Sequence, residues 1–105
     1  MKSMQPAEAA RALASGGGKL IDVRTPAEFA ALHARGAHNI PLDRLDPVSV
    51  HAEVVPGESV FCICRSGMRS GVAIAKLHAA GVPNVVNIAG GIDAWVRAGL
   101  PVARG

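Results

Sequence analysis

Short apolar runs alternate with helical patterns along this chain, and this alternation is the feature that most constrains its fold. Strands are predicted over residues 1–5, 19–23, 37–40, 60–63 and 85–88, and helices over residues 6–15, 25–35, 71–80 and 93–98. Residues 19–23 have the continuous apolar run of a strand that is covered on both faces, and residues 60–63 and 85–88 are also interpreted as buried strands. The pattern predicts an α/β fold, an open parallel sheet of four or five strands with helices on both faces.

Capping signals mark several helix boundaries. Thr25 and Glu28 form a capping box around Pro26, and that helix is expected to end near residues 35–36. The segment 42–56 is irregular and predicts one or two short helical turns. The triple glycine at residues 16–18 follows a helix and precedes a strand, the reverse of a phosphate cradle, and is interpreted as a turn.

Composition limits the classes of function. The 105 residues suit one domain, over residues 1–105, and the basic residues behind the net charge of +3 are scattered. Only three residues are aromatic, so a basic face with stacking aromatics for nucleic acid is not expected. No segment is long and apolar enough to cross a membrane, and no signal peptide is recognisable. We expect a cytoplasmic protein without a nucleic-acid or membrane partner.

Cys64 lies between a predicted strand and a predicted helix. Ligand sites form at the carboxyl ends of parallel strands, and a helix N-terminus offers free N–H groups to an anion. Arg65 and Arg69 add two positive charges, and Gly67 permits the positive φ of an anion nest. Such surroundings lower a cysteine pKa from about 8.5 into the range of about 3.5–7.5. Cys64 is therefore predicted to be a catalytic nucleophile.

The other loop residues are candidates for binding substrate. Ser66 and Ser70 can donate hydrogen bonds to a sulfur anion, although helix capping would explain Ser70 equally well. Gly67 is expected to turn backbone N–H groups inward. Met68 could form an apolar rim for a thiol partner, but an exposed loop methionine is the interpretation we favour.

Three arginines are candidates for binding an anion. Arg69 can hold a substrate oxyanion through two hydrogen bonds, and a cation at a helix N-terminus is unfavourable unless an anion is present. Arg65 is expected to steer substrate. Arg24 is either a third cation on the pocket wall or the partner of Glu28 or Asp22, and the sequence leaves both open.

Two further residues are assigned to the core. Cys62 lies within an apolar strand, and Trp95 is expected to pack behind the last turn. The four histidines are dispersed and have no metal-binding spacing.

Four patches of this sequence together resemble the single-domain rhodaneses, a family of thiosulfate sulfurtransferases. They occur in the family's order and spacing over nearly the whole chain: residues 21–29, 33–41, 64–70 and 90–95. The resemblance implies a strand order of 1-5-4-2-3, with the Cys64 strand in the centre. It also implies transfer of a sulfane sulfur from thiosulfate or a persulfide to cyanide or a thiol, through a Cys64 persulfide. The implied partners are a small anionic sulfur donor and a thiol or protein acceptor, and no cofactor is required.

Alternative functions are compatible with the same scaffold. A phosphatase or arsenate reductase is disfavoured because only four residues separate Cys64 from Arg69, which leaves less room for a tetrahedral phosphoryl group. A non-catalytic interaction module is disfavoured because the cysteine and both loop arginines are present. A carrier that relays persulfide sulfur to another protein would have the same loop.

Overall fold

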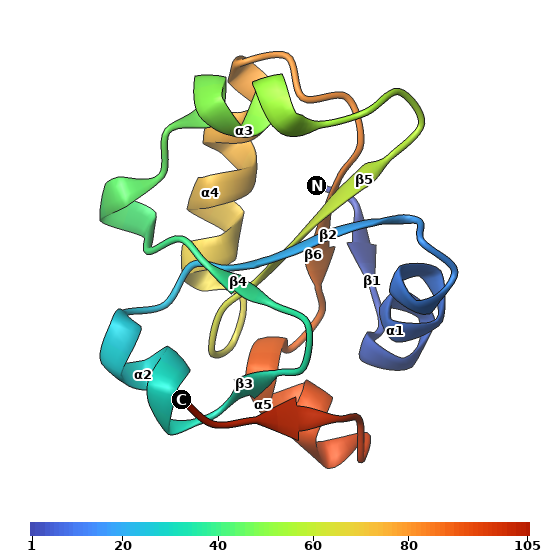
Figure 1. The fold of residues 1–105 in the computed structure, drawn as a ribbon, viewed down its shortest axis with the longest axis vertical. Helices are drawn as coiled ribbons and strands as arrows, with labels where there is room; N and C mark the ends of the chain where they lie inside the picture. The colour runs from blue at the N-terminus through green and yellow to red at the C-terminus, as the bar shows by residue number, and fades with distance from the viewer.

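The computed structural model describes residues 1–105, and its main sheet has five parallel strands (Figure 1). The strands are β1 (Ser3–Met4), β2 (Gly18–Asp22), β4 (His38–Asn39), β5 (Ser59–Ile63) and β6 (Val85–Ile88). Their spatial order is β1-β6-β5-β2-β4. Counted within this sheet alone, that is the predicted order 1-5-4-2-3, so the predicted topology is confirmed.

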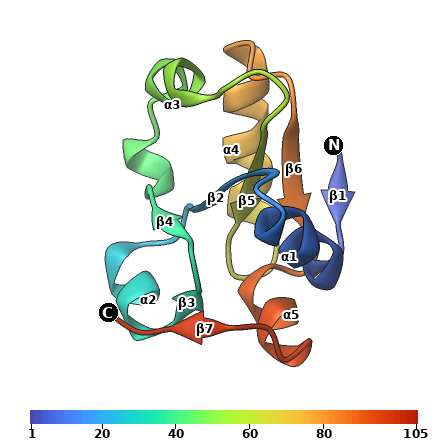
Figure 2. The ribbon, with the colours of Figure 1, turned by 45° about the vertical axis from the view of Figure 1, so that its right-hand side comes forward.

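Helices cover both faces of the sheet (Figures 1 and 2). They are α1 (Pro6–Ala14), α2 (Pro26–Ala31), α3 (Pro47–Glu53), α4 (Met68–Ala79) and α5 (Gly91–Arg97), with a 3₁₀ turn η1 (Leu42–Arg44). Side chains of α3 and α4 pack on one face, and side chains of α1 and α5 pack on the other. No helix has the length and apolarity needed to cross a membrane.

The central strand β5 shows why the apolar runs are continuous. Val60 and Cys62 belong to the cluster under α3 and α4, whereas Phe61 and Ile63 belong to the cluster under α1 and α5. All four side chains are at most 1% exposed. Because successive residues of a strand point to opposite faces, both faces need apolar residues. Because β5 is the central strand of the sheet, Cys64, the residue that follows it, lies in the middle of the row of carboxyl-terminal strand ends.

The prediction of a helix over residues 25–35 is wrong in its second half. The capping box is present, since the Thr25 hydroxyl accepts from the Glu28 N–H and the Glu28 carboxylate accepts from the Thr25 N–H. Helix α2 nevertheless ends at Ala31, and Leu32 is extended. The next residues form β3 (His33–Ala34), which pairs with β7 (Val102–Ala103) in a separate antiparallel ribbon. The distant partner strand overrides the local helical pattern. Helices α4 and α5 also begin earlier than predicted, at Met68 and Gly91.

Candidate active site

The loop between β5 and α4 carries the candidate nucleophile, at the lower end of β5 in Figure 1. Gly67 caps α4 with a φ of +123°, a conformation that side chains disfavour. This turn aims the Gly67 N–H at the Cys64 sulfur, with 3.0 Å between nitrogen and sulfur. The 12-residue helix α4 starts at Met68 and directs its positive dipole end toward the same sulfur.

The surroundings of Cys64 favour its thiolate. Cys64 is only 1% exposed, and burial by itself would raise the pKa of the thiol. The Ser70 side chain, 3.5 Å from the sulfur, and backbone N–H groups of Ser70, Gly67 and Ser66 act in the opposite direction. Their combined effect outweighs burial, so the pKa of Cys64 lies below its ordinary value. The loop can therefore hold a sulfur anion.

The second cysteine has the opposite character. Burial raises the pKa of Cys62 to about 12, and the neighbouring Cys64 adds to this effect. Cys62 is fully enclosed in the core, as expected from its strand position. A thiol with so high a pKa is almost entirely protonated at neutral pH, so only Cys64 is a candidate nucleophile.

Helix α5 holds the loop through the backbone carbonyls of Cys64 and Arg65. The Ile92 N–H donates to the Cys64 carbonyl at 2.7 Å, and the Asp93 N–H donates to the Arg65 carbonyl at 3.4 Å. A Cβ atom on Gly91 would collide with both carbonyl oxygens. The close approach of α5 therefore requires glycine. Because the carbonyls are held by α5, the N–H groups of the loop remain free to face the sulfur.

A buried chain of polar side chains lies behind Ser70. The Ser70 hydroxyl is 3.0 Å from the Gly67 carbonyl and 2.5 Å from Oδ1 of Asn87 in β6. The Asn87 amide in turn donates to the Ser3 hydroxyl in β1 at 3.3 Å. Ser70 is fully buried and Asn87 is 6% exposed. The position of the Ser70 oxygen next to Cys64 is therefore fixed by groups on two other elements.

Arg69 makes a two-pronged ion pair with Glu28 of α2. The guanidinium donates to the two carboxylate oxygens at 2.6 and 2.9 Å. The hydrogen bond from Arg69 lowers the pKa of Glu28 to about 2. Both side chains are about one-third exposed. The role of Arg69 in holding a substrate oxyanion stays a prediction, and it requires the guanidinium to leave Glu28 or to share its donors.

Arg24 pairs with Asp22, one of the two partners that the sequence left open. Asp22 accepts from Nε and Nη2 of Arg24 at 2.8–3.1 Å and from the Arg24 N–H at 2.9 Å. Nη2 also donates to the Leu32 carbonyl at 2.6 Å, just after α2. Arg24 is 5% exposed. It braces the end of α2 and also lines the cavity described next, so its contact with substrate stays a prediction.

A cavity of about 570 Å³ lies between α2, the start of the loop and α5. Arg24, Arg65 and Arg97 line it together with Glu28 and Asp93. Arg65 is 72% exposed and only loosely paired with Asp93, at 3.7 Å. We call this space the arginine cavity. Its excess of positive charge suits a small anion, and Arg65 and Arg97 are its exposed cations.

The remaining loop residues, Ser66 and Met68, point toward solvent. Met68 is 84% exposed, which matches the interpretation of an exposed methionine, and Ser66 is also exposed. Ser66 contributes its backbone N–H to the sulfur environment. Gly67 and Ser70 thus contact the Cys64 sulfur directly. Arg24, Arg65 and Arg69 make no hydrogen bond to this sulfur. No cluster of His, Cys, Asp or Glu could hold a metal ion.

Comparison with known proteins identifies the family. The model of the rhodanese-like domain matches residues 5–98. The chain belongs to the rhodanese-like family.

Some proteins that are similar to this rhodanese-like domain are named sulfurtransferases. A sulfurtransferase of Allochromatium vinosum is 42% identical over 83 residues, which cover 79% of this chain and 76% of the relative. An uncharacterized protein of Synechocystis sp. is 41% identical over 86 residues, which cover 81% of this chain but only 46% of that protein. Among solved structures, the human single-domain sulfurtransferase TSTD1 has a TM-score of 0.78 and 27% identity, covering 92% of this chain and 96% of that one.

Four residues of this rhodanese-like site were missed as site residues in the sequence: Glu28, Asn87 and Gly91, which position the loop, and Arg97, which lines the arginine cavity. Asn87 had a detectable signal, because it is an amide within the apolar run 85–88 beside the Cys64 strand. Gly91 belongs to a conspicuous glycine pair. Glu28 was assigned to helix capping or to a pair with Arg24, and nothing local indicates that it meets Arg69, 41 residues away.

Proposed function

We propose that this rhodanese-like domain is a sulfurtransferase that moves a sulfane sulfur from thiosulfate or a persulfide to a thiophilic acceptor. The main support is the enclosed Cys64 sulfur, which meets the Gly67 N–H at 3.0 Å and has a lowered pKa. The names of the relatives from Allochromatium vinosum and human agree with this chemistry. The donor, the acceptor and the persulfide belong to the proposal.

The first half-reaction forms a persulfide. The Cys64 thiolate attacks the outer sulfur of thiosulfate, the sulfur–sulfur bond of the donor breaks, and sulfite leaves with the electron pair. The new outer sulfur carries the negative charge. The N–H groups of the loop and the N-terminus of α4 stabilise this charge, as they stabilise the thiolate.

The second half-reaction regenerates the thiolate. A nucleophile, cyanide in an assay or a thiolate in a cell, attacks the outer sulfur of the persulfide. A bond forms between the nucleophile and the outer sulfur, and the sulfur–sulfur bond to Cys64 breaks. The electron pair of the broken bond returns to the Cys64 sulfur. In this scheme Arg65 attracts the anionic donor into the arginine cavity, and Arg24 and Arg69 add positive potential near it. A thiol on a second protein would serve equally well as acceptor.

The deciding experiment measures thiocyanate formed from thiosulfate and cyanide, with the wild type and with Cys64→Ser. We expect turnover in the wild type and none in the variant. Mass spectrometry after thiosulfate treatment should find one added sulfur atom on the wild type alone. Cys62→Ser is the matched control, since it removes the buried thiol and keeps the loop. Sulfur loading of Cys64→Ser, or turnover of an aryl phosphate that depends on Cys64, would contradict the proposal.

A further inference from the structure

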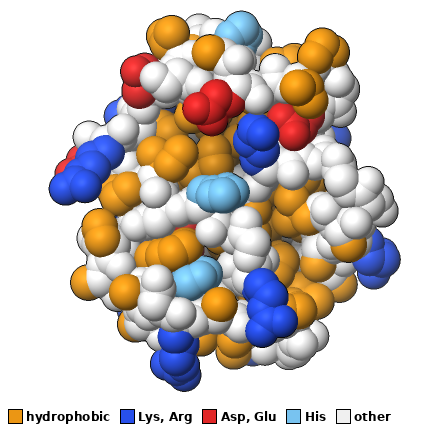
Figure 3. All heavy atoms as spheres, viewed as in Figure 1, with side chains coloured by type: hydrophobic (Ala, Val, Ile, Leu, Met, Phe, Trp, Pro, Cys, Tyr) orange, Lys and Arg blue, Asp and Glu red, His pale blue; other side chains and the backbone are white.

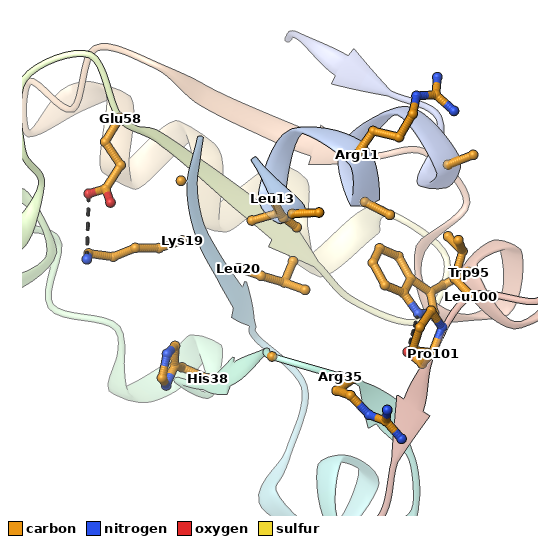
Figure 4. Close-up of a pocket in the computed structure, with 15 residues that line it drawn as sticks. Arg11, Leu13, Lys19, Leu20, Arg35, His38, Glu58, Trp95, Leu100 and Pro101 are labelled. Atoms are coloured by element: carbon orange, nitrogen blue, oxygen red, sulfur yellow. Dashed lines mark hydrogen bonds and ion pairs between the residues drawn. The ribbon is translucent and has the colours of Figure 1, made fainter. Parts of the chain in front are cut away.

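A second and larger cavity, of about 760 Å³, lies over the amino-terminal half of β2. None of its lining residues belongs to the Cys64 loop, and it opens on the face of the sheet that carries α1 and α5 (Figure 4). Helix α1 packs beside this part of β2, and no helix closes the space toward β4. The volume is within the range of about 300–1,000 Å³ that is typical of small-molecule sites. We call this space the β2 groove.

The interior of the β2 groove is apolar. Leu13 of α1 and Leu20 of β2 face each other across it, and Trp95 and Leu100 close one end (Figure 4). Leu20 and Trp95 are 3% exposed, and the Trp95 indole N–H is satisfied by the Pro101 carbonyl at 2.9 Å. The floor and the closed end are thus firmly packed core residues. They give the groove a fixed apolar shape.

Basic side chains lie along the rim opposite α1. They are Lys19 of β2, His38 of β4 and Arg35 of the turn between β3 and β4 (Figure 4). Basic and histidine side chains border exposed apolar surface on this side of the molecule (Figure 3). Lys19 forms an ion pair with Glu58, with 3.6 Å between Nζ and Oε1. Arg35 has no carboxylate partner, and its only side-chain hydrogen bond is a long one to the Val102 carbonyl at 3.5 Å.

We propose that the β2 groove binds a small carboxylate with an apolar tail, of the class of medium-chain fatty acids. The tail would replace water along the half-buried side chains of Ala10, Leu13 and Leu100, above the buried Leu20 and Trp95, and the carboxylate would meet the rim at Arg35. A cationic amphiphile would meet the same rim with the wrong sign. A concave site of ligand size with one closed end suits a small molecule better than a protein helix, which needs an open trough.

The test uses decanoate, below its micellar concentration, and two-dimensional amide NMR of the whole chain. Shifts should concentrate at residues of the groove and at the indole N–H of Trp95, which is the only tryptophan in the sequence. Amides of residues 64–70 should stay in place. Decyltrimethylammonium, with the same tail and the opposite charge, should bind at least about tenfold more weakly.

Matched variants separate a local contact from general electrostatics. Arg35→Glu should weaken decanoate binding about tenfold, whereas Arg44→Glu, an equal change of charge on an exposed residue outside the groove, should leave it unchanged. Leu13→Gln, on the half-buried apolar wall, should also weaken binding. Cys64→Ser should bind decanoate like the wild type, so failure of the proposed sulfur transfer would not affect the result.

Four outcomes would overturn the proposal. The first three are an affinity for decanoate weaker than about 1 mM, equal binding of the cationic amphiphile, and equal losses in Arg35→Glu and Arg44→Glu. Binding that shifts the Cys64 loop in place of the groove would also overturn it, because the carboxylate would then occupy the site of the sulfur donor.

Discussion

The guanidinium of Arg69 and the carboxylate of Glu28 are joined by two hydrogen bonds, at 2.6 and 2.9 Å, between the start of α4 and the first turn of α2. The same carboxylate also caps α2 through the Thr25 N–H at 3.0 Å. Glu28 thus couples the helix behind the Cys64 loop to the helix beside the arginine cavity. We therefore expect the ionisation of Glu28 to affect both the free energy of unfolding and the activity.

Replacing Glu28 should remove a pH-dependent part of the stability. The folded-state pKa of Glu28 is about 2, below the ordinary 4.5, so its contribution is complete above pH 4.5 and is lost as the pH falls toward 2. With solvent screening of this pair, which is about one-third exposed, Glu28→Gln should cost about 1 kcal/mol at pH 7. Urea unfolding should show this difference from wild type shrinking between pH 4.5 and pH 2. Glu53→Gln, an exposed and unpaired glutamate, is the control. A pH-independent difference would contradict the ion-pair account.

Freeing Arg69 should change substrate affinity if Arg69 holds the donor. In Glu28→Gln the neutral amide binds the guanidinium less strongly, so its donors become available to an anion near Cys64. The KM for thiosulfate should then fall about twofold or more, while Arg69→Gln should raise it. A kinetic assay of both variants decides the role of Arg69. If the two variants raise KM alike, Arg69 acts only by joining the helices.

Arg65 should select anionic reagents at Cys64. Its side chain is 72% exposed beside the cavity, and its contact with Asp93 is loose. Arg65→Gln should slow alkylation by iodoacetate about threefold and leave the neutral iodoacetamide nearly unaffected. Raising the salt concentration should reduce this preference. Arg44→Gln supplies the control for net charge, and equal slowing of both reagents would mean that Arg65 shapes the loop instead.

Ser70 should set the ionisation of Cys64. Its hydroxyl and N–H are among the groups that lower the pKa of the thiol against the effect of burial. In Ser70→Ala the midpoint of iodoacetamide reactivity against pH should move upward, and Ser70→Thr, which keeps the hydroxyl, should restore it. Peptide mapping should find the label on Cys64 alone, because the pKa of Cys62 is about 12. An unchanged midpoint in Ser70→Ala would assign the lowered pKa to the backbone N–H groups.

Gly91 should be intolerant of a side chain because α5 touches the loop there. Gly91→Ala adds a Cβ that collides with the Cys64 and Arg65 carbonyls, at a φ of +61°. Gly99 is the matched control, since its φ is +72° but no atom lies within 4 Å of the added Cβ. Gly99→Ala should cost about 1 kcal/mol, and Gly91→Ala about 3 kcal/mol with loss of sulfur transfer. Equal costs in thermal unfolding would show that only backbone conformation matters at Gly91.

Much of the fold could be predicted because its signals are local. Apolar runs located the three central strands β2, β5 and β6, the capping box located the start of α2, and the strand–loop–helix pattern around Cys64 located the candidate nucleophile. The end of α2 was mispredicted because β3 depends on pairing with β7, far along the chain. The Arg69–Glu28 pair and the link from Ser70 to Asn87 depend on how elements meet in space. Local sequence patterns carry no information on such meetings.

The pairing of β1 with β6 also has a kinetic consequence. Ser3 lies opposite Asn87 in this pairing, 84 residues away along the chain. Closing so long a loop is entropically costly, and contacts of this range form slowly. During synthesis, the first strand must wait until nearly the whole chain has emerged before its partner exists. Ser3 ends the hydrogen-bond path through Asn87 and Ser70 to Cys64, so we expect the candidate nucleophile to gain this part of its support late in folding.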